Sequence, residues 1–179
     1  PLDVEVWSSP ALAHSMIYVG ATDGMIYALG DPAKQTMLAK TWTSFGADSR
    51  HTGLAPTLGP TTITPKIVFN AGGGVNGSPV LDDAGNIYVG TSSGILYGLE
   101  RDGTVRWTYN TGLVMGSPAL DAQGNEVAAS QGGVVHKLNP QGQLLWTHWL
   151  ANTIQASPCV GPDGSVYIGD TGGSFFGIS

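Results

Sequence analysis

The chain has 179 residues and a formal net charge of −6, and its 11% of charged residues is well below the roughly 25% of an average soluble domain. Together with 27 glycines, this composition argues against a helical bundle and a charge-rich disordered chain, and the acidic balance excludes nucleic acid and anionic lipid as electrostatic partners. A single cysteine, Cys159, excludes an internal disulfide and a cysteine-rich zinc site.

A repeat of about 40 residues organises the chain. Its marker is a Ser-Pro pair, and the last three of its four copies are separated by 39 and 40 residues. The pairs are Ser9-Pro10, Ser78-Pro79, Ser117-Pro118 and Ser157-Pro158. Eight to ten residues after each pair we expect a short apolar strand that ends in a small residue: Ile17–Gly20, Ile87–Gly90, Val127–Ser130 and Val166–Gly169.

Each of these strands is followed by a glycine-containing turn and a third strand. The third strands are expected at 25–29, 95–99, 134–138 and 174–178. A fourth strand carries a tryptophan in two copies, Trp107 within 104–109 and Trp146 within 144–149. Four short strands in every 40 residues is the period of a β-propeller blade. We therefore predict an all-β propeller of about four blades with almost no helix, as a closed four-blade ring, half of an eight-blade ring, or a fragment.

The stretch from 30 to 65 departs from the repeat, and its Pro, Gly and Thr content indicates an irregular connection. Val68 lies ten residues before Ser78, as Trp107 lies ten before Ser117, so 66–70 is expected to be a fourth strand. In one alternative this strand closes the first blade. In the other, 38–42 closes the first blade, and 66–70 completes an open last blade by strand exchange. Trp42 supplies the aromatic of a fourth strand and favours the second alternative.

The expected division is a first blade over 1–42, an irregular connection over 43–65, and a closing strand with three further blades over 66–179. The last blade lacks its outer strand. Strand exchange with a second copy would complete that blade, so a homodimer with about eight blades is expected.

The repeat has the consensus Ser-Pro, then Gly-x-(Ile/Val)-Tyr-(Val/Ile)-Gly, then Gly-x-(Leu/Ile)-Tyr-x-Leu, then Asp-Gly-x-x-x-Trp. It resembles the pyrroloquinoline-quinone-type (PQQ-like) propeller repeat of the quinoprotein dehydrogenase-like superfamily, over residues 5–33 and 66–179. The third copy is weaker, since His136 stands where the second copy has Tyr97. The segment 42–53 resembles a motif near the start of some bacterial members, which implies permuted, tandem or truncated blades.

The resemblance implies one of two functions. Quinoprotein dehydrogenases hold the quinone over the ring axis, usually under a vicinal Cys-Cys disulfide, with Ca²⁺ bound by Glu, Asn and Asp. Other members bind no cofactor and serve as scaffolds, such as the lipoprotein of the outer-membrane barrel-assembly machinery and the sensor domains of some receptor kinases. Cys159 alone cannot form the vicinal disulfide, and Arg50, Arg101 and Arg106 are the only arginines for three quinone carboxylates. We therefore expect the non-catalytic branch, without a cofactor.

Two acidic stretches, 82–86 and 121–125, are the candidate calcium loops. A calcium loop alternates acidic residues towards a bidentate Glu, and neither stretch does so. Both lie where the repeat requires a hairpin, so we assign Asp82 and Asp121 to turn hydrogen bonds and predict no metal site.

Asp48, Arg50 and His51 form a polar cluster in the irregular stretch. A histidine held by a carboxylate could act as a base, but no Ser or Cys nucleophile has a recognisable setting such as Gly-x-Ser-x-Gly. We expect these three side chains to tie the connection to a blade edge, and we assign no catalytic residue.

The remaining histidines, His14, His136 and His148, fall at different points of the repeat and have no metal-ligand spacing. His136 stands at a tyrosine position and is expected to pack rather than to bind a ligand.

Trp107 and Trp146 recur at one repeat position and are expected to seal contacts between blades. Trp7 and Trp149 lie off that position, and an exposed pair would offer an aromatic platform to a sugar ring or an apolar side chain. Cys159 follows Pro158 on an inner strand, so it is expected to be a small buried residue rather than a reactive thiol.

We predict a non-catalytic scaffold of an exported bacterial protein that binds protein or glycan through loops at one end of the ring. Two alternatives stay open: part of a PQQ- and Ca²⁺-dependent dehydrogenase whose cofactor site lies outside this chain, and a structural module of a larger adhesin or surface assembly. The few lysines and the acidic balance fit a periplasmic or extracellular setting. Because apolar runs reach only four or five residues, we expect no membrane span. The printed sequence starts at Pro1 without a charged-then-apolar stretch, so we expect any export signal to have been removed or never present.

Overall fold

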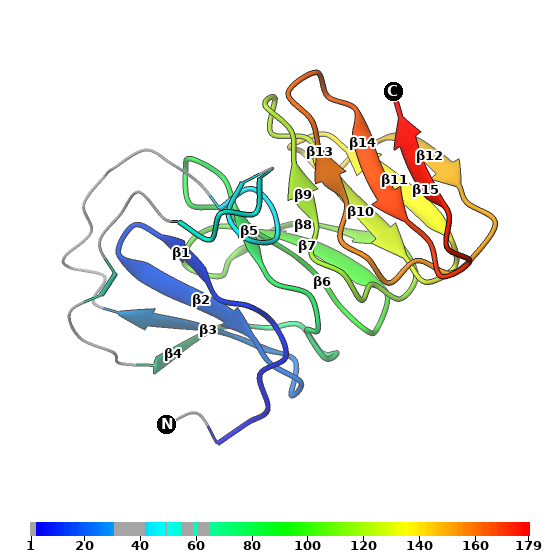
Figure 1. Ribbon diagram of the computed structural model, residues 1–179. Coiled ribbons are helices and arrows are strands. Elements are labelled where there is room, and N and C mark those ends of the chain that lie inside the picture. The colour runs from blue at the N-terminus through cyan, green and yellow to red at the C-terminus, as the bar shows by residue number, and fades with distance from the viewer. Residues whose placement is uncertain (1–2, 31–41, 49, 55–58, 61–64) are drawn as a thin grey trace.

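The computed structural model describes residues 3–30, 42–48, 50–54, 59–60 and 65–179. These residues form strands and loops without a helix, and the strands make four antiparallel sheets, blades 1 to 4 (Figure 1). Blade 1 contains β1 (Ala11–Ala13), β2 (Met16–Gly20), β3 (Met25–Gly30) and β4 (Pro65–Asn70). Blade 2 contains β5 (Val80–Leu81), β6 (Ile87–Gly90), β7 (Ile95–Leu99) and β8 (Val105–Asn110). Blade 3 contains β9 (Ala119–Leu120), β10 (Glu126–Ser130), β11 (Val134–Leu138) and β12 (Leu144–Trp149). Blade 4 contains β13 (Cys159–Val160), β14 (Val166–Gly169) and β15 (Phe175–Ile178).

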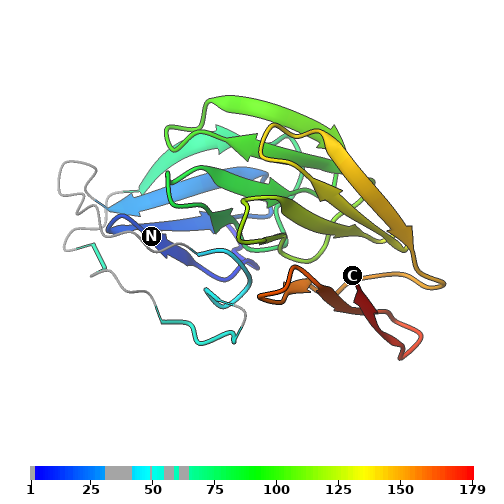
Figure 2. The ribbon, with the colours of Figure 1, turned by 90° about the horizontal axis from the view of Figure 1, so that it is seen from above.

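The blades follow one another in an open arc, with blade 1 at one end and blade 4 at the other (Figure 2). The outer strands β4, β8 and β12 lie along the convex side of this arc. The all-β propeller prediction is therefore confirmed, and the closed four-blade ring does not describe the chain. Blade 4 has three strands, as the sequence predicts. In the described part of the chain, no helix has the length or the apolar character needed to cross a bilayer.

The closing strand of blade 1 corrects the preferred sequence interpretation. Strand β4 pairs with β3 of the same chain, with Phe69 opposite Ile26 and Asn70 opposite Met25. The first alternative is thus the one observed, and exchange of 66–70 into another blade is wrong for this chain. The spacing to the next Ser-Pro pair was the better guide, because it fixes where the outer strand must end before the chain returns to the axis. Trp42 is described, whereas 38–41 lie outside the described residues.

The inner hairpins use aspartate as the sequence predicts. Asp82 Oδ1 accepts the backbone N–H groups of Ala84 and Asn86 at 3.0 and 2.9 Å. Asp121 makes the equivalent bonds in the β9–β10 turn at 2.9 and 2.8 Å. Gly85, with φ 84°, occupies the left-handed position that the β5–β6 turn requires. The acidic stretches therefore serve the hairpins.

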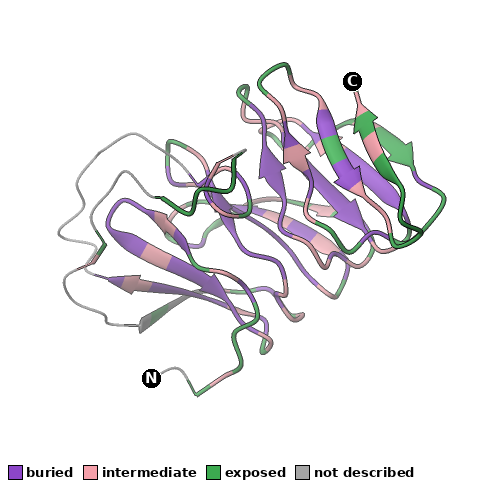
Figure 3. Cartoon of the chain, viewed as in Figure 1, coloured by how far each residue is buried: buried purple, intermediate pink, exposed green. Residues whose placement is uncertain are grey.

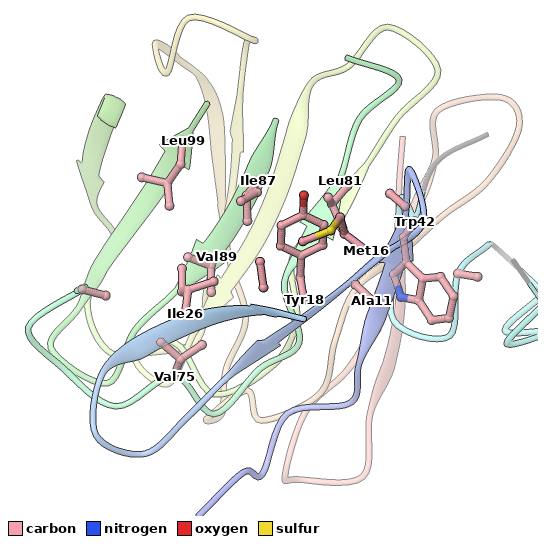
Figure 4. Packing of buried hydrophobic residues seen from close by; sticks show 14 residues of the cluster. Ala11, Met16, Tyr18, Ile26, Trp42, Val75, Leu81, Ile87, Val89 and Leu99 are labelled. Atoms are coloured by element: carbon pink, nitrogen blue, oxygen red, sulfur yellow. The ribbon is translucent and has the colours of Figure 1, made fainter. Parts of the chain in front are cut away.

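Apolar residues fill the spaces between neighbouring blades. Between blades 1 and 2, Tyr18 and Ile26 pack in one buried cluster with Leu81, Ile87 and Val89 (Figure 4). A second cluster joins blades 3 and 4 through β10, β11, β14 and β15. Burial is concentrated on the inner strands of blades 1 to 3, whereas β12 and β15 are exposed along much of their length (Figure 3). Each sheet is therefore stabilised by its neighbours rather than by a core of its own.

The third repeat is displaced by one residue from its expected alignment. Glu126 pairs with Leu138, as Ile87 pairs with Leu99 in blade 2, so Glu126 occupies the position of Ile87. The sequence prediction aligned Val127 with Ile87 because both residues are apolar, whereas Glu126 is acidic. The consequence is a fully buried glutamate between blades 2 and 3.

Candidate functional site

The segment Trp42–Asp48, which we call the axial segment, hydrogen-bonds to the inner strands of two blades. The N–H of Leu81 in β5 donates to Trp42 O at 2.8 Å, and the N–H of Leu120 in β9 donates to Thr43 O at 2.7 Å. The Trp42 side chain is buried in the cluster between blades 1 and 2. Backbone bonds and one indole therefore fix the irregular connection near the propeller axis.

The polar cluster of the connection has a different role from the expected one. Asp48 Oδ1 accepts the N–H groups of Arg50 and Thr52 at 2.9 and 3.2 Å, and its Oδ2 accepts the Thr52 hydroxyl at 2.9 Å. Arg50 and His51 are exposed, and the His51 ring lies 5.9 Å from that of Phe45. The Asp48 carboxylate and the His51 ring thus make contacts within their own loop, to which Arg50 contributes its backbone N–H, and none of these contacts ties the loop to a blade edge. The prediction failed because the backbone of the axial segment already makes that attachment.

Beside the axial segment lies a pocket of about 280 Å³, which we call the axial pocket. Its walls are loops: the axial segment and the turns that follow the inner strands β9 and β13. The lining residues are Thr43, Ser44, Asp48, Leu120, Asp121, Ala122, Val160, Gly161 and Pro162. A second hollow of about 170 Å³ shares Thr43 and Asp121 with it and adds Asp82 and Asp83 to its lining. The two hollows form one depression across the inner turns of blades 2, 3 and 4.

Carboxylates dominate the charge of this depression. Hydrogen bonds from the backbone and the hydroxyl of Thr52 lower the pKa of Asp48. Burial alone would raise the pKa of Asp121, but hydrogen bonds from Asn125 and Lys137 outweigh it and hold that pKa below its ordinary value. Lys137 Nζ lies 2.9 Å from Asp121 Oδ2. Both carboxylates are therefore ionised at neutral pH.

Tyr88 shows how the inner turn is connected to the outer strand of blade 2. Its hydroxyl donates to Asp82 Oδ2 at 3.0 Å and accepts from Arg106 at 3.2 Å. Burial and the neighbouring Asp82 charge raise the pKa of Tyr88 to about 12. The tyrosine stays protonated and serves as a structural bridge.

The other three histidines are outside the lining of the axial pocket and lie on different elements. His14 is buried in the β1–β2 turn, and His148 is exposed on β12. His136 is buried, its Nδ1 lies 3.5 Å from the Tyr109 hydroxyl, and burial lowers its pKa. The prediction that His136 packs in the structure is therefore confirmed.

The tryptophans divide as their repeat positions predict. Trp107 donates its indole N–H to Pro140 O of the next blade at 3.1 Å, and Trp146 packs against the cluster between blades 3 and 4. Trp7 and Trp149 are 67% and 74% exposed. Trp7 precedes β1 of blade 1, and Trp149 ends β12 of blade 3. These two segments lie far apart along the arc, so the two tryptophans make no common platform (Figures 1 and 2).

Cys159 is only half-buried, contrary to the expectation of a buried residue. It lies on β13 and pairs with Tyr167 of β14, which is 40% exposed. The sequence correctly located the inner strand but could not show that blade 4 leaves this residue partly exposed.

The marker serines form a relay that the sequence analysis missed. The N–H of each serine donates to the hydroxyl of the next: Ser9 to Ser78 at 2.8 Å, Ser78 to Ser117 at 2.8 Å, and Ser117 to Ser157 at 2.9 Å. The recurrence of the Ser-Pro pair was the available signal. The serine was overlooked because the proline explained the start of the strand on its own.

Glu126 is the second residue whose environment was missed. Both of its carboxylate oxygens are buried and have no hydrogen-bond partner among the described residues. Burial raises its pKa well above the ordinary value, so the neutral carboxyl is favoured over the carboxylate between the blades.

The residues near the axis do not fit the quinone of the PQQ-type dehydrogenases. Its three carboxylates require cationic partners. The axial pocket is instead lined by two aspartates, and Lys137 is paired with one of them. In the described ranges, no three His, Cys, Asp or Glu side chains are grouped to hold a metal ion.

Comparisons with known proteins support the fold. Neither a protein-family model nor a curated protein matches the chain. Among solved structures, BamB from Moraxella catarrhalis superimposes with a TM-score of 0.68 at 19% identity, over 99% of this chain and 47% of that one. The computationally designed Ika4 protein gives 0.64 at 14% identity, over 100% of this chain and 94% of that one. A europium-containing methanol dehydrogenase gives 0.54 at 14% identity, over 86% and 35%. The chain thus has the architecture of a β-propeller and spans about half the length of the BamB chain.

Proposed function

We propose that the chain is a non-catalytic PQQ-like propeller scaffold that binds a basic segment of a protein partner at the axial pocket. The observation that carries the proposal is the acidic lining of the depression, to which Asp48, Asp82, Asp83 and Asp121 contribute. Carboxylates around a hollow attract Lys and Arg side chains and steer a basic partner towards it. Thr43 and the turn backbones add polar groups that can bind a peptide.

The way the pocket is built supports binding rather than catalysis. Its walls are loops held on rigid strands, which is where propellers and other rigid folds place recognition. The lining residues offer Thr43 and Ser44 hydroxyls but include neither a histidine base nor a cysteine nucleophile. The carboxylates are engaged in turn hydrogen bonds, which favours a fixed electrostatic surface over proton transfer.

The setting of the scaffold is part of the same proposal. Its acidic balance and small number of lysines fit a periplasmic or extracellular bacterial protein. A structural module of a larger adhesin would present the same pocket. A dehydrogenase with its cofactor site elsewhere would not need an acidic axial pocket in this part of the ring.

Fluorescence anisotropy with labelled decapeptides tests the proposal. Peptides with three Lys or Arg residues should bind, whereas matched peptides with three Asp or Glu residues should not. Asp83→Asn should weaken binding roughly three- to ten-fold at low ionic strength, because it removes an exposed rim charge. Asp23→Asn, which removes an exposed aspartate from the β2–β3 turn of blade 1, outside both hollows, is the matched control and should leave affinity unchanged.

Three results would contradict the proposal. Equal binding of basic and acidic peptides would exclude the rim charge as the basis of recognition. Binding of neutral oligosaccharides at the axial pocket, with no peptide binding, would assign the site to glycan. Pyrroloquinoline quinone retained through dialysis with Ca²⁺, together with dye-linked alcohol or sugar oxidation, would restore the dehydrogenase alternative.

A further inference from the structure

The uncovered side of blade 4 carries residues that are buried everywhere else in the repeat. Phe175 pairs with Gly169 as Leu96 pairs with Gly90. Leu96 is fully buried, whereas Phe175 is 74% exposed. Tyr167 is 40% exposed, whereas Tyr88, at the same position of blade 2, is 1% exposed. The Tyr167 and Phe175 rings stack on each other with centroids 6.3 Å apart. Blade 4 therefore presents an aromatic surface of the kind that its sister blades bury against their neighbours.

The opposite end of the arc carries the matching pocket. Between blades 1 and 2, the tyrosine of one blade packs with Leu81 and Ile87 of the next. The residues of blade 1 at those two positions are Leu12 and Ile17, which pair with each other as Leu81 pairs with Ile87. Both line an apolar pocket of about 300 Å³, whose other walls are Pro10, Trp42, Gly53, Leu54 and Gly59. This pocket lies where the repeat places the tyrosine of a preceding blade.

The serine relay is open at both ends of the same arc. In the described part of the chain, the N–H of Ser157 donates no hydrogen bond and the hydroxyl of Ser9 accepts none. Between each pair of neighbouring blades within the chain, the same serine N–H and serine hydroxyl form a hydrogen bond of 2.8 to 2.9 Å. The relay would continue without a break if Ser157 of one blade 4 met Ser9 of another blade 1.

A small residue of one blade and a branched residue of the next form a further matched pair. Val114 lies three residues before its marker serine, and a Cβ on Gly90 of the preceding blade would lie 2.5 Å from Val114 Cγ1. Val75 packs in the same way over Gly20. Val6 holds this position before blade 1 and is 39% exposed. A Cβ added to Gly169 of blade 4 would have no described side-chain atom within 4 Å. Among the described residues, Val6 therefore packs over no glycine of a preceding blade, and no branched side chain packs over Gly169.

We propose that a second copy of this chain closes the ring, with blade 4 of each copy packed against blade 1 of the other. All three matched features, the pocket, the relay and the valine–glycine pair, occur at opposite ends of one chain, so the best complement to each end is another copy. Two such contacts related by a two-fold axis join four blades to four. Strand β4 remains in its own blade, so this is face-to-face packing and not the strand exchange that the structure contradicts. Two copies together also have about the length of the BamB chain, of which one copy spans 47%.

One residue makes the closing contact differ from the internal ones. A Cβ on Gly116 would lie 2.6 Å from Ala156 O of the next blade, so only glycine permits that approach. Ala156 itself holds the equivalent position in blade 4 and would meet the backbone of blade 1 in the second copy. At the same approach its methyl group would clash with the facing backbone, so the closing backbones must lie further apart, and Ala156→Gly should tighten the dimer.

Sedimentation equilibrium of the chain between about 1 and 100 µM tests the proposal. The expected species is a dimer, with twice the 18.5 kDa mass of the chain. Phe175→Asp should weaken the dimer at least about 30-fold, and Val6→Arg should do the same, because both contacts of either homodimer are then damaged. Both residues are exposed in the single chain, so circular dichroism should show an intact β fold in each variant.

Mixing the two variants gives the sharpest outcome. In a mixed dimer, blade 4 of the Phe175→Asp copy meets blade 1 of the Val6→Arg copy, so this contact carries both substitutions. The other contact joins blade 4 of the Val6→Arg copy to blade 1 of the Phe175→Asp copy and carries neither. The mixture should therefore associate at concentrations at which each variant alone is monomeric. A monomeric natural chain at 100 µM would overturn the proposal, as would a dimer unaffected by Val6→Arg, which indicates blade 4 packed on blade 4. Open polymers or rings of more than two copies would overturn closure by two.

Discussion

The interface between blades 2 and 3 and the uncovered side of blade 4 are made from the same repeat positions in two different environments. At the position of Leu96 and Phe175, the first residue is fully buried and the second is mostly exposed. The marker serine is buried in blades 2 and 3 and half-buried in blades 1 and 4. The comparison teaches that the repeat encodes an interface in every blade, and that the neighbour decides whether it is used. Matched substitutions at the two places can therefore separate intrinsic from neighbour-dependent stability.

The largest difference is expected for the apolar position itself. Leu96→Ala removes a buried side chain from the contact with Ala128 and Leu138 and should lower the free energy of unfolding by about 3 kcal/mol. Phe175→Ala should lower it by less than about 0.5 kcal/mol in dilute monomer, because its side chain is exposed. Urea unfolding of both variants measures this, and equal losses would show that blade 4 is covered in the single chain.

The glycine of the second strand should give the next largest contrast. Gly90→Ala forces its new methyl group against Val114 and should cost about 2 kcal/mol. Gly169→Ala meets only Ser174 O at 3.6 Å and should be nearly neutral in the monomer. Thermal unfolding of the pair checks the contrast, which a comparable loss in Gly169→Ala would remove.

Glu126 sharpens the comparison among the buried positions. Ile87 and Val166 hold its place in blades 2 and 4, so Glu126→Leu should raise the free energy of unfolding at pH 7 by about 1–2 kcal/mol. The pKa of Glu126 is raised in the folded state above its unfolded value near 4.5. The folded state therefore binds its proton more tightly than the unfolded state, and stability is greatest below about pH 4.5 and falls as pH rises towards the folded pKa.

Glu126→Leu should remove this decline. Unfolding measured from pH 4 to pH 8 in the two proteins shows the effect as a difference that grows with pH. A difference independent of pH would mean that the carboxyl is ionised or solvated in the folded state.

The smallest contrast is expected for the serine relay. Ser117→Ala leaves the N–H of Ser78 without its acceptor between two blades and should cost about 1 kcal/mol. Ser9→Ala removes a hydroxyl that accepts no described hydrogen bond and should cost less than about 0.5 kcal/mol. Chemical unfolding at low concentration compares them, and similar losses would contradict an open relay.

The sequence predicts the repeated parts of this fold well because they are set by local rules. Hairpin aspartates and glycines fix the turns, and the Ser-Pro spacing fixes the order of the strands. The partner of 66–70 could not be read in the same way, because Trp42 fits an outer strand by composition but is buried beside the axis. Glu126 was misplaced because its burial comes from blade 2, not from its own strand.

The axial pocket was predictable only as loops at one end of the ring. Its walls come from the axial segment and from turns about 75 and 115 residues further along the chain, and no local pattern brings these together. Asp48 was singled out correctly as a polar residue of the connection. Its partners were not, because they depend on how the loop folds back on itself.

Hydrogen exchange at the Ser157 amide, followed as a function of protein concentration, tests the central claim most directly. The Ser78 and Ser117 amides donate within the chain and should exchange slowly at every concentration. We predict that the Ser157 amide exchanges quickly in dilute solution and becomes as slow as the other two once a second copy binds. Slow exchange at every concentration would mean that blade 4 is already covered, and fast exchange at every concentration would mean that no second copy completes the relay.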